Sequence, residues 1–226
     1  MKRLGVLLIL PLLAVMTGNA QENLGIEVSV SSGIVLPSSP MTFADYWNVQ
    51  YGGELRAGYP LSQSITLVGA VEYYQFKLNQ NGVAKGFDTQ YMRDIWIFNN
   101  VSMNPSADPS SVTTVSANLR FAPSRLAGVL SPYFIGGIGA MRFSLSEIKL
   151  PTTSVLSVNG ANISMTAQQT ITGGVQTSAF FQFGMGFDIQ LTQSFDLIVE
   201  ARYASGLTNS LHTAYVPITG GIKLRL

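Results

Sequence analysis

The residues best suited to chemistry are twelve charged side chains that occupy alternate positions in otherwise apolar segments. Six are acids and six are bases: Glu27, Glu54, Glu72, Asp188, Asp196 and Glu200, against Arg56, Arg120, Arg142, Arg202, Lys223 and Arg225. Balanced opposite charges suit a narrow protein interior, because each buried charge needs a partner. The pattern predicts a structural network of ion pairs. A narrow path for ions or protons is the alternative.

The single histidine, His212, is a second candidate, since Ser210 precedes it by two residues in "TNSLHTA". Hydrolysis through an activated serine needs a histidine and an orienting carboxylate. Both residues fall in an expected loop, where a solvated histidine is the simpler interpretation. The sequence has no cysteine, and it shows no glycosidase-type acid pair, metal-ligand cluster or phosphate loop. We therefore expect no catalytic residue, no metal and no cofactor.

Eight segments carry the charges, and each alternates apolar and polar residues as a two-faced strand does. They cover about 24–36, 48–59, 64–78, 112–121, 132–145, 179–191, 195–204 and 214–226. In the fifth segment, the alternation predicts an apolar face that contains Tyr133, Ile135, Met141 and Phe143. Arg142 is then on the polar face. The last segment is expected to pair with the first and close the sheet.

The connections alternate in length. Those after the second, fourth and sixth segments are short, whereas those at about 37–47, 79–111, 146–177 and 205–213 are mostly longer. An even number of strands with short turns at one end is the plan of an outer-membrane barrel, whose longer loops are extracellular. Within 146–177, Asn159-Gly160 lies between two alternating runs and predicts a projecting hairpin.

The first twenty residues have a different pattern. A basic start, the apolar run "LGVLLILPLLAVM" and small residues before Gln21 predict a signal peptide over 1–20, cleaved after about Ala20. The mature domain would then be 21–226, in which no apolar run reaches the length of a transmembrane helix. The near-zero net charge argues against a nucleic-acid partner, because no basic stripe is available to neutralise phosphates.

Three observations favour apolar faces that point outward into lipid. A soluble ligand-binding barrel also alternates but needs a charged exterior, whereas only 11% of these residues are charged. The charges collect on faces rich in Gly, Ser, Thr, Asn and Gln. Aromatic residues lie toward the strand ends of the apolar faces, as interfacial girdles require: Tyr59, Tyr73, Tyr133, Phe195 and Tyr203. We predict an all-β fold, an eight-stranded antiparallel up-and-down transmembrane β-barrel, too narrow for a diffusion porin.

The signal sequence, the eight segments and repeats such as "SPYFIGGIGAMRF" and "FFQFGMGFDIQL" resemble the small outer-membrane β-barrel family, which includes OmpA-type membrane domains, OmpX-like proteins and opacity-type surface proteins. The resemblance implies the outer membrane of a Gram-negative-type bacterium. It implies contact with lipid and lipopolysaccharide, and insertion by the barrel-assembly machinery through the C-terminal strand, although Leu226 replaces the family's usual terminal aromatic. No periplasmic domain is expected after that strand.

For function, the resemblance implies envelope structure, adhesion, surface contact or resistance to external agents, and we expect a non-enzymatic protein. Barrels of this size include lipid-modifying enzymes, which remain an alternative beside the narrow pore. The expected loops carry candidate residues for an extracellular ligand or surface: Phe43, Tyr46, Trp47, Tyr91, Ile95, Trp96 and Phe98. Exposed aromatic clusters suggest a contact surface. Packing on one another or on the strands is the alternative.

Overall fold

The computed structural model describes residues 25–91, 99–123, 129–158, 161–207 and 213–226. The predicted signal peptide lies outside the described residues, so that prediction stays open. None of the helices among the described residues is both long and apolar enough to span a membrane.

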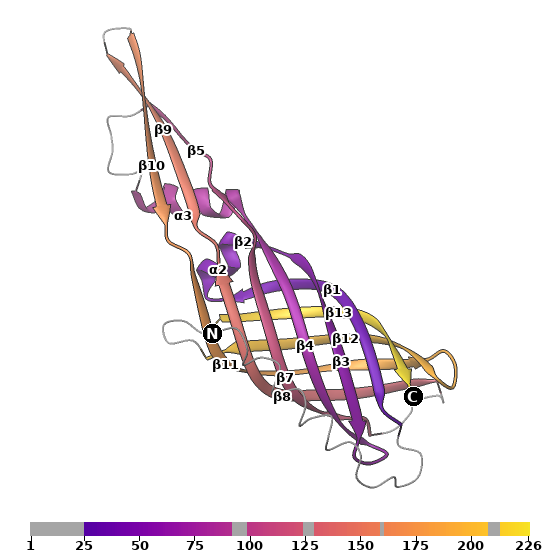
Figure 1. The fold of residues 1–226 in the computed structure, drawn as a ribbon. Coiled ribbons are helices and arrows are strands. Elements are labelled where there is room, and N and C mark those ends of the chain that lie inside the picture. The colour runs from indigo at the N-terminus through magenta and orange to yellow at the C-terminus, as the bar shows by residue number, and fades with distance from the viewer. Residues whose placement is uncertain (1–24, 92–98, 124–128, 159–160, 208–212) are drawn as a thin grey trace.

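Eight long strands form a closed antiparallel barrel (Figure 1). They are β1 (Glu27–Ser39), β3 (Gln50–Pro60), β4 (Ile65–Leu78), β7 (Ser110–Phe121), β8 (Leu130–Leu145), β11 (Gly174–Gln190), β12 (Phe195–Gly206) and β13 (Thr213–Arg225). Each pairs with the next along the chain, and β13 returns to β1 with Glu27 opposite Arg225. The predicted fold and the predicted closure are confirmed. Closure pairs the backbone groups that an open edge would leave unpaired in lipid.

Two of the connections at one end are short turns built on the same motif. In "LSQSI" the Ser62 hydroxyl accepts hydrogen bonds from the backbone N–H of Ser64 and Ile65, at 3.3 and 3.1 Å. In "LTQSF" Thr192 does the same for Ser194 and Phe195, at 3.3 and 3.1 Å. Hydroxyl side chains that satisfy the backbone in this way favour turns over strand continuation. We call this the short-turn end and the opposite one the long-loop end.

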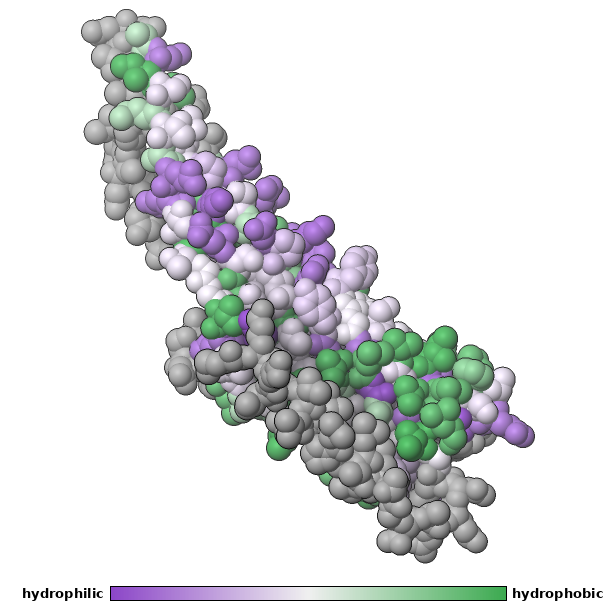
Figure 2. Space-filling model, viewed as in Figure 1, coloured by the Kyte–Doolittle hydropathy of each residue, from purple (hydrophilic) through white to green (hydrophobic). Residues whose placement is uncertain are grey.

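Seven of the eight strands keep the predicted faces. The outer wall is apolar and exposed, as at Val30, Leu55, Val71, Val115, Leu119, Phe183, Met185, Val199, Ile218 and Ile222. The inward positions of the same strands are buried and largely polar. On the face shown in Figure 2, hydrophobic residues gather over the barrel, and hydrophilic residues gather over the part that carries the helices. This is the alternation of a membrane barrel.

The face prediction for β8 is wrong. Tyr133, Ile135, Met141 and Phe143 are buried inside the barrel, while Phe134 and Ile138 are exposed on its outer wall. Arg142 is exposed with them. The two candidate faces of this strand are both apolar, so alternation alone did not determine which one points outward. The inward glycines decide it: a Cβ on Gly137 would lie 2.1 Å from the Asn118 amide oxygen, so that position must stay empty to admit a polar neighbour.

The long-loop half of the interior is filled by an apolar plug. Its buried members come from seven barrel strands, from the loop region and from strand β9: Val35, Phe43, Trp47, Tyr74, Phe76, Val83, Val112, Met141, Phe143, Ile148, Leu150, Phe180, Ala204 and Tyr215. Helix α2 (Met41–Tyr46) inserts Phe43 between Phe76 and Phe143, with ring centroids 5.0 and 5.3 Å apart. Helix α3 (Gln80–Tyr91) packs beside α2.

A second sheet projects beyond the long-loop end (Figure 1). It contains β9 (Ile148–Val158), β10 (Ala161–Ile171), β5 (Asn99–Met103) and the short β6 (Ser106–Ala107), in the order β10-β9-β5 with β6 also on β9. Two-residue β2 (Trp47–Asn48) pairs with the end of β4. The predicted hairpin is confirmed, because Val158 pairs with Ala161 across the Asn159-Gly160 link.

Candidate functional site

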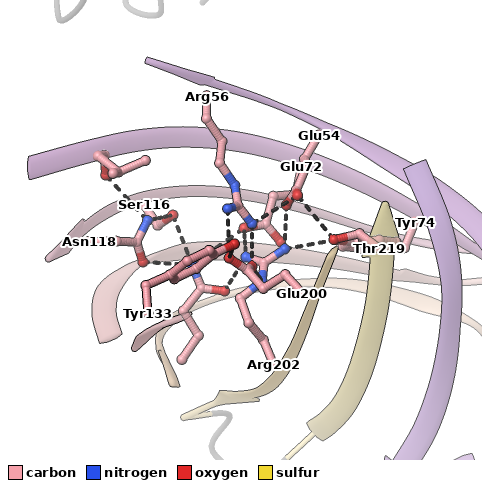
Figure 3. Close-up of polar contacts among 12 residues, drawn as sticks. Glu54, Arg56, Glu72, Tyr74, Ser116, Asn118, Tyr133, Glu200, Arg202 and Thr219 are labelled. Atoms are coloured by element: carbon pink, nitrogen blue, oxygen red, sulfur yellow. Dashed lines mark hydrogen bonds and ion pairs between the residues drawn. The ribbon is translucent and has the colours of Figure 1, made fainter. Parts of the chain in front are cut away.

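The centre of the barrel holds a cluster of three glutamates and two arginines (Figure 3). Arg202 reaches all three carboxylates: its Nη1 lies 2.6 Å from Glu72 Oε1, its Nε lies 2.6 Å from Glu200 Oε1, and its Nη2 pairs with Glu54. Arg56 Nη2 lies 2.8 Å from Glu54 and 2.5 Å from Glu200. The carboxylate side chains are fully buried. We call these five residues the middle cluster.

Neutral side chains complete the middle cluster. Tyr133 donates a hydrogen bond of 2.8 Å to Glu200, and Thr219 donates one of 3.3 Å to Glu54. Gln182 accepts from Arg202 at 2.7 Å and donates to Asn118 at 2.7 Å. Buried ion pairs persist only when further hydrogen bonds offset the loss of hydration. These groups therefore hold the charges in one fixed arrangement.

A lower cluster lies toward the short-turn end. Lys223 Nζ is 2.6 Å from Asp188 and 3.1 Å from Asp196. Arg120 pairs with Glu27 at 3.1 Å and also with Asp188, and Arg225 pairs with Asp196. The six residues carry three acids and three bases, so their formal charges balance.

Tyr133 joins the two clusters. Its hydroxyl binds the middle cluster, while its ring lies 4.3 Å from the Arg120 guanidinium carbon, in cation–π geometry. A cavity of about 20 Å³, room for about one water, lies between the clusters and is lined in part by Arg56, Arg120 and Lys223. Below it, a mouth of about 470 Å³ opens among the short turns, lined in part by Ser62 and Ser131.

The structure brings eleven of the twelve predicted charged residues into these clusters: Glu27, Glu54, Arg56, Glu72, Arg120, Asp188, Asp196, Glu200, Arg202, Lys223 and Arg225. The prediction for Arg142 is wrong, because the corrected face of β8 puts that side chain on the outer wall. The middle cluster consequently has three carboxylates for two guanidiniums. Tyr133 was missed for the same reason. Tyr74, which accepts a hydrogen bond of 3.3 Å from Arg202, was also missed, although it alternates in phase with Glu72.

The loop candidates are not one exposed patch. Phe43 and Trp47 are only 5% and 3% exposed, because they fill the plug, so they are not contact residues. Tyr46 is half-buried and packs close to Gly86. Tyr91 ends α3, and its side chain lies outside the described residues, as do Ile95, Trp96 and Phe98. Ser210 and His212 lie outside them too.

A closed eight-stranded barrel with an apolar outer wall and an ion-paired interior defines an integral β-barrel protein of the outer membrane. No family model matches the chain, and no curated protein matches it. The chain is similar in structure to Neisserial surface protein A, at 14% identity and a TM-score of 0.47 over 89% of this chain and 97% of that one.

Two further solved structures share this level of similarity. The attachment invasion locus protein Ail of Yersinia pestis is 13% identical, with a TM-score of 0.38 over 88% of this chain and 97% of that one. The N-terminal β-barrel domain of Pseudomonas aeruginosa OprF is 15% identical, with a TM-score of 0.41 over the same shares. The eight-stranded assignment rests on this chain's own strand pairing.

Proposed function

We propose that this protein is a non-enzymatic outer-membrane barrel that contacts a surface or partner outside the cell through its projecting sheet. The short turns then face the periplasm and the long-loop end faces outward. The observation that carries this proposal is the exposure of β10, which lies at the edge of that sheet. Its residues Ala161–Thr170 are all exposed, and they include no charged residue, glycine or proline.

The composition of the projecting hairpin supports a contact role. No Asp, Glu, Lys or Arg occurs from Leu150 to Phe187. Ile163 and Met165 are 51% and 55% exposed on one side of β10, whereas Asn162 and Ser164 lie on the other. An exposed apolar patch rimmed by neutral polar groups is a common feature of interaction sites.

The filled interior favours contact over transport. The apolar plug and the middle cluster both lie within the barrel, and the side chains of the cluster are at most 6% exposed. The alternative of a narrow ion pore needs a water path past charged lumen residues such as Arg142, Glu200 and Arg202, but Arg142 is on the outer wall, and the other two are paired. The lumen therefore supports a structural role for its charges.

Orientation can be tested directly, because the chain has no cysteine. Thr166→Cys and Gln63→Cys each supply one thiol at an exposed position, at opposite ends of the molecule. A membrane-impermeant maleimide should label the Thr166→Cys protein on intact cells, and the Gln63→Cys protein only after the outer membrane is permeabilised. The reverse pattern contradicts the proposed orientation.

Contact can be tested by adherence of cells that display the protein to epithelial monolayers and to polystyrene. Ile163→Asp should reduce the number of adherent cells several-fold, because it places a charge on the apolar side of β10. Asn162→Asp adds the same charge on the other side and should leave adherence within about twofold. The hairpin can be shortened by joining Thr152 to Ala167 through Asn-Gly, because these two residues are paired. Cells that display the shortened protein should adhere no better than cells without it. Unchanged adherence of the folded, shortened protein would overturn the proposal.

A further inference from the structure

Arg142 differs from the other strand bases because it is on the outside of the barrel. It is exposed, and no ion pair links it to any part of the chain that the structure describes. Met141 and Phe143 beside it are buried, and Ile138, four residues before it on the same outer wall, is 71% exposed. A cation on this wall must meet either lipid or the lipid headgroups.

The depth of Arg142 can be derived from strand geometry. Phe134, near the short-turn end, faces outward and is paired with Phe121, the last residue of β7. From Phe134 to Arg142 a strand climbs about 26 Å at roughly 3.3 Å per residue. A tilt of about 40° reduces this to about 20 Å of height, against an apolar band about 25 Å tall. Arg142 therefore lies where the band ends on the long-loop side, where a cation costs little.

The outward residues on the β7 and β4 side of Arg142 support that boundary. Next to Ala140, the neighbouring outward residues are Val115 and Ala179, which are apolar. Beyond Arg142, Ser144 pairs with Ser111, and Ser111 faces Gln75. On the side of β7 and β4 the wall therefore changes from apolar to hydroxyl and amide groups at the level of Arg142, whereas on the β11 side Val175, which is paired with Ser144, is 59% exposed.

Arg142 is also part of a continuous row of hydrogen-bonding side chains. Its paired residues are Thr113 on β7 and Thr177 on β11, and Thr113 is paired in turn with Tyr73 on β4. All four face outward, and directly paired residues lie about 5 Å apart. A guanidinium is thus flanked on both sides by threonine hydroxyls, with a tyrosine of the interfacial girdle one strand further.

We propose that Tyr73, Thr113, Arg142 and Thr177 form a binding site for the phosphate group of a lipid in the leaflet at the long-loop end. In the orientation of the proposed function, that leaflet is the outer one. The assignment of the site to the outer leaflet therefore rests on the proposed function. A guanidinium presents a planar pair of donors that matches two phosphate oxygens. The threonine hydroxyls can donate to the remaining oxygens, and the acyl chains of the lipid can lie along the apolar wall below.

The test uses the folded protein in uncharged maltoside micelles, where neither orientation nor adhesion matters. Bisphosphorylated lipid A is titrated, and the bound fraction is measured by native mass spectrometry. R142Q should weaken binding about tenfold, the effect of losing one charge-assisted hydrogen-bonded pair. R142K keeps the positive charge but loses the planar pair of N–H donors, and it should weaken binding several-fold. T113V combined with T177V should have an effect of the same size.

Lys77→Gln is the matched control, because Lys77 is an exposed base on the same outer face as Tyr73, four residues further along β4. It should leave affinity within about twofold. The site is refuted if folded R142Q and R142K bind as the parent does, or if Lys77→Gln loses as much as R142Q. Displacement of the lipid by low millimolar inorganic phosphate would also refute it, because it would show a general anion site. Thiol labelling of Thr166→Cys tests the orientation separately, so the two proposals can fail independently.

Discussion

Replacing Arg202 with methionine is expected to destabilise the barrel strongly. Arg202 is the only side chain of the described residues that pairs with all three glutamates of the middle cluster, and its side chain is 1% exposed. Removing one partner of a buried ion pair costs roughly 3–5 kcal/mol, because the other charge stays buried without compensation. Here three carboxylates would be left to Arg56 alone, so the loss should lie at or above the upper part of that range.

The free energy of unfolding can be measured by urea titration in phosphatidylcholine vesicles. Tryptophan fluorescence reports the transition, because Trp47, one of the two tryptophans, is buried in the plug. Lys77→Met removes an exposed base and should change the free energy by less than about 0.5 kcal/mol. Glu72 is the informative second site, because Arg202 supplies its one ion pair within the described chain.

The double variant Arg202→Met with Glu72→Gln should be more stable than the sum of the two single effects, by roughly 0.5–3 kcal/mol. The glutamine removes one of the unpaired charges and keeps the shape of the side chain. A loss below about 1 kcal/mol for Arg202→Met, or strict additivity with Glu72→Gln, would refute the interpretation of the middle cluster as a coupled structural unit.

Three further results are expected from other layers of the barrel. Phe43→Ala should lower the free energy of unfolding by roughly 3–5 kcal/mol through the cavity it leaves in the plug, whereas Met41→Ala, at a 77% exposed position, should not. Gly137→Leu should abolish the heat-modifiable gel shift of the folded barrel, because a Cβ there would lie 2.1 Å from the Asn118 amide oxygen. Gly174→Ala should retain the shift, because a Cβ at position 174 would meet no atom within 4 Å. In planar bilayers the protein should give no steady conductance, because the plug and the middle cluster fill the interior.

These results have clear counterparts that would contradict the reasoning. Equal stability of the Phe43 and Met41 variants would mean that the plug does not stabilise the barrel. A normal gel shift for Gly137→Leu would refute the corrected face of β8. Stable single-channel openings would support the alternative hypothesis of a narrow ion pore.

The sequence alone determined the class of fold, because lipid and a narrow lumen impose opposite polarities on alternate residues. Segments such as 179–191, with Phe183 and Met185 opposite Gln182 and Asp188, can satisfy both environments in only one way. The short turns were also predicted, from the close spacing of the segments that they join.

Alternation was insufficient where both faces of a segment are apolar. The plug makes the long-loop half of the lumen hydrophobic, so inward Met141 and Phe143 have the same character as lipid-facing residues. Only packing against neighbouring strands, through Asn118 and Gly137, sets the face of β8. That choice moves Arg142 from the lumen to the outer wall.

The sequence indicated which charges belong inside, and only the tertiary structure decided which of them meet. Glu54 and Arg202 are 148 residues apart in the chain, and Arg56 and Glu200 are 144 apart. They come together because β13 closes on β1 and fixes one register around the ring. Local patterns set the face of a side chain, whereas its partner across the lumen depends on the registers of all the strands between them.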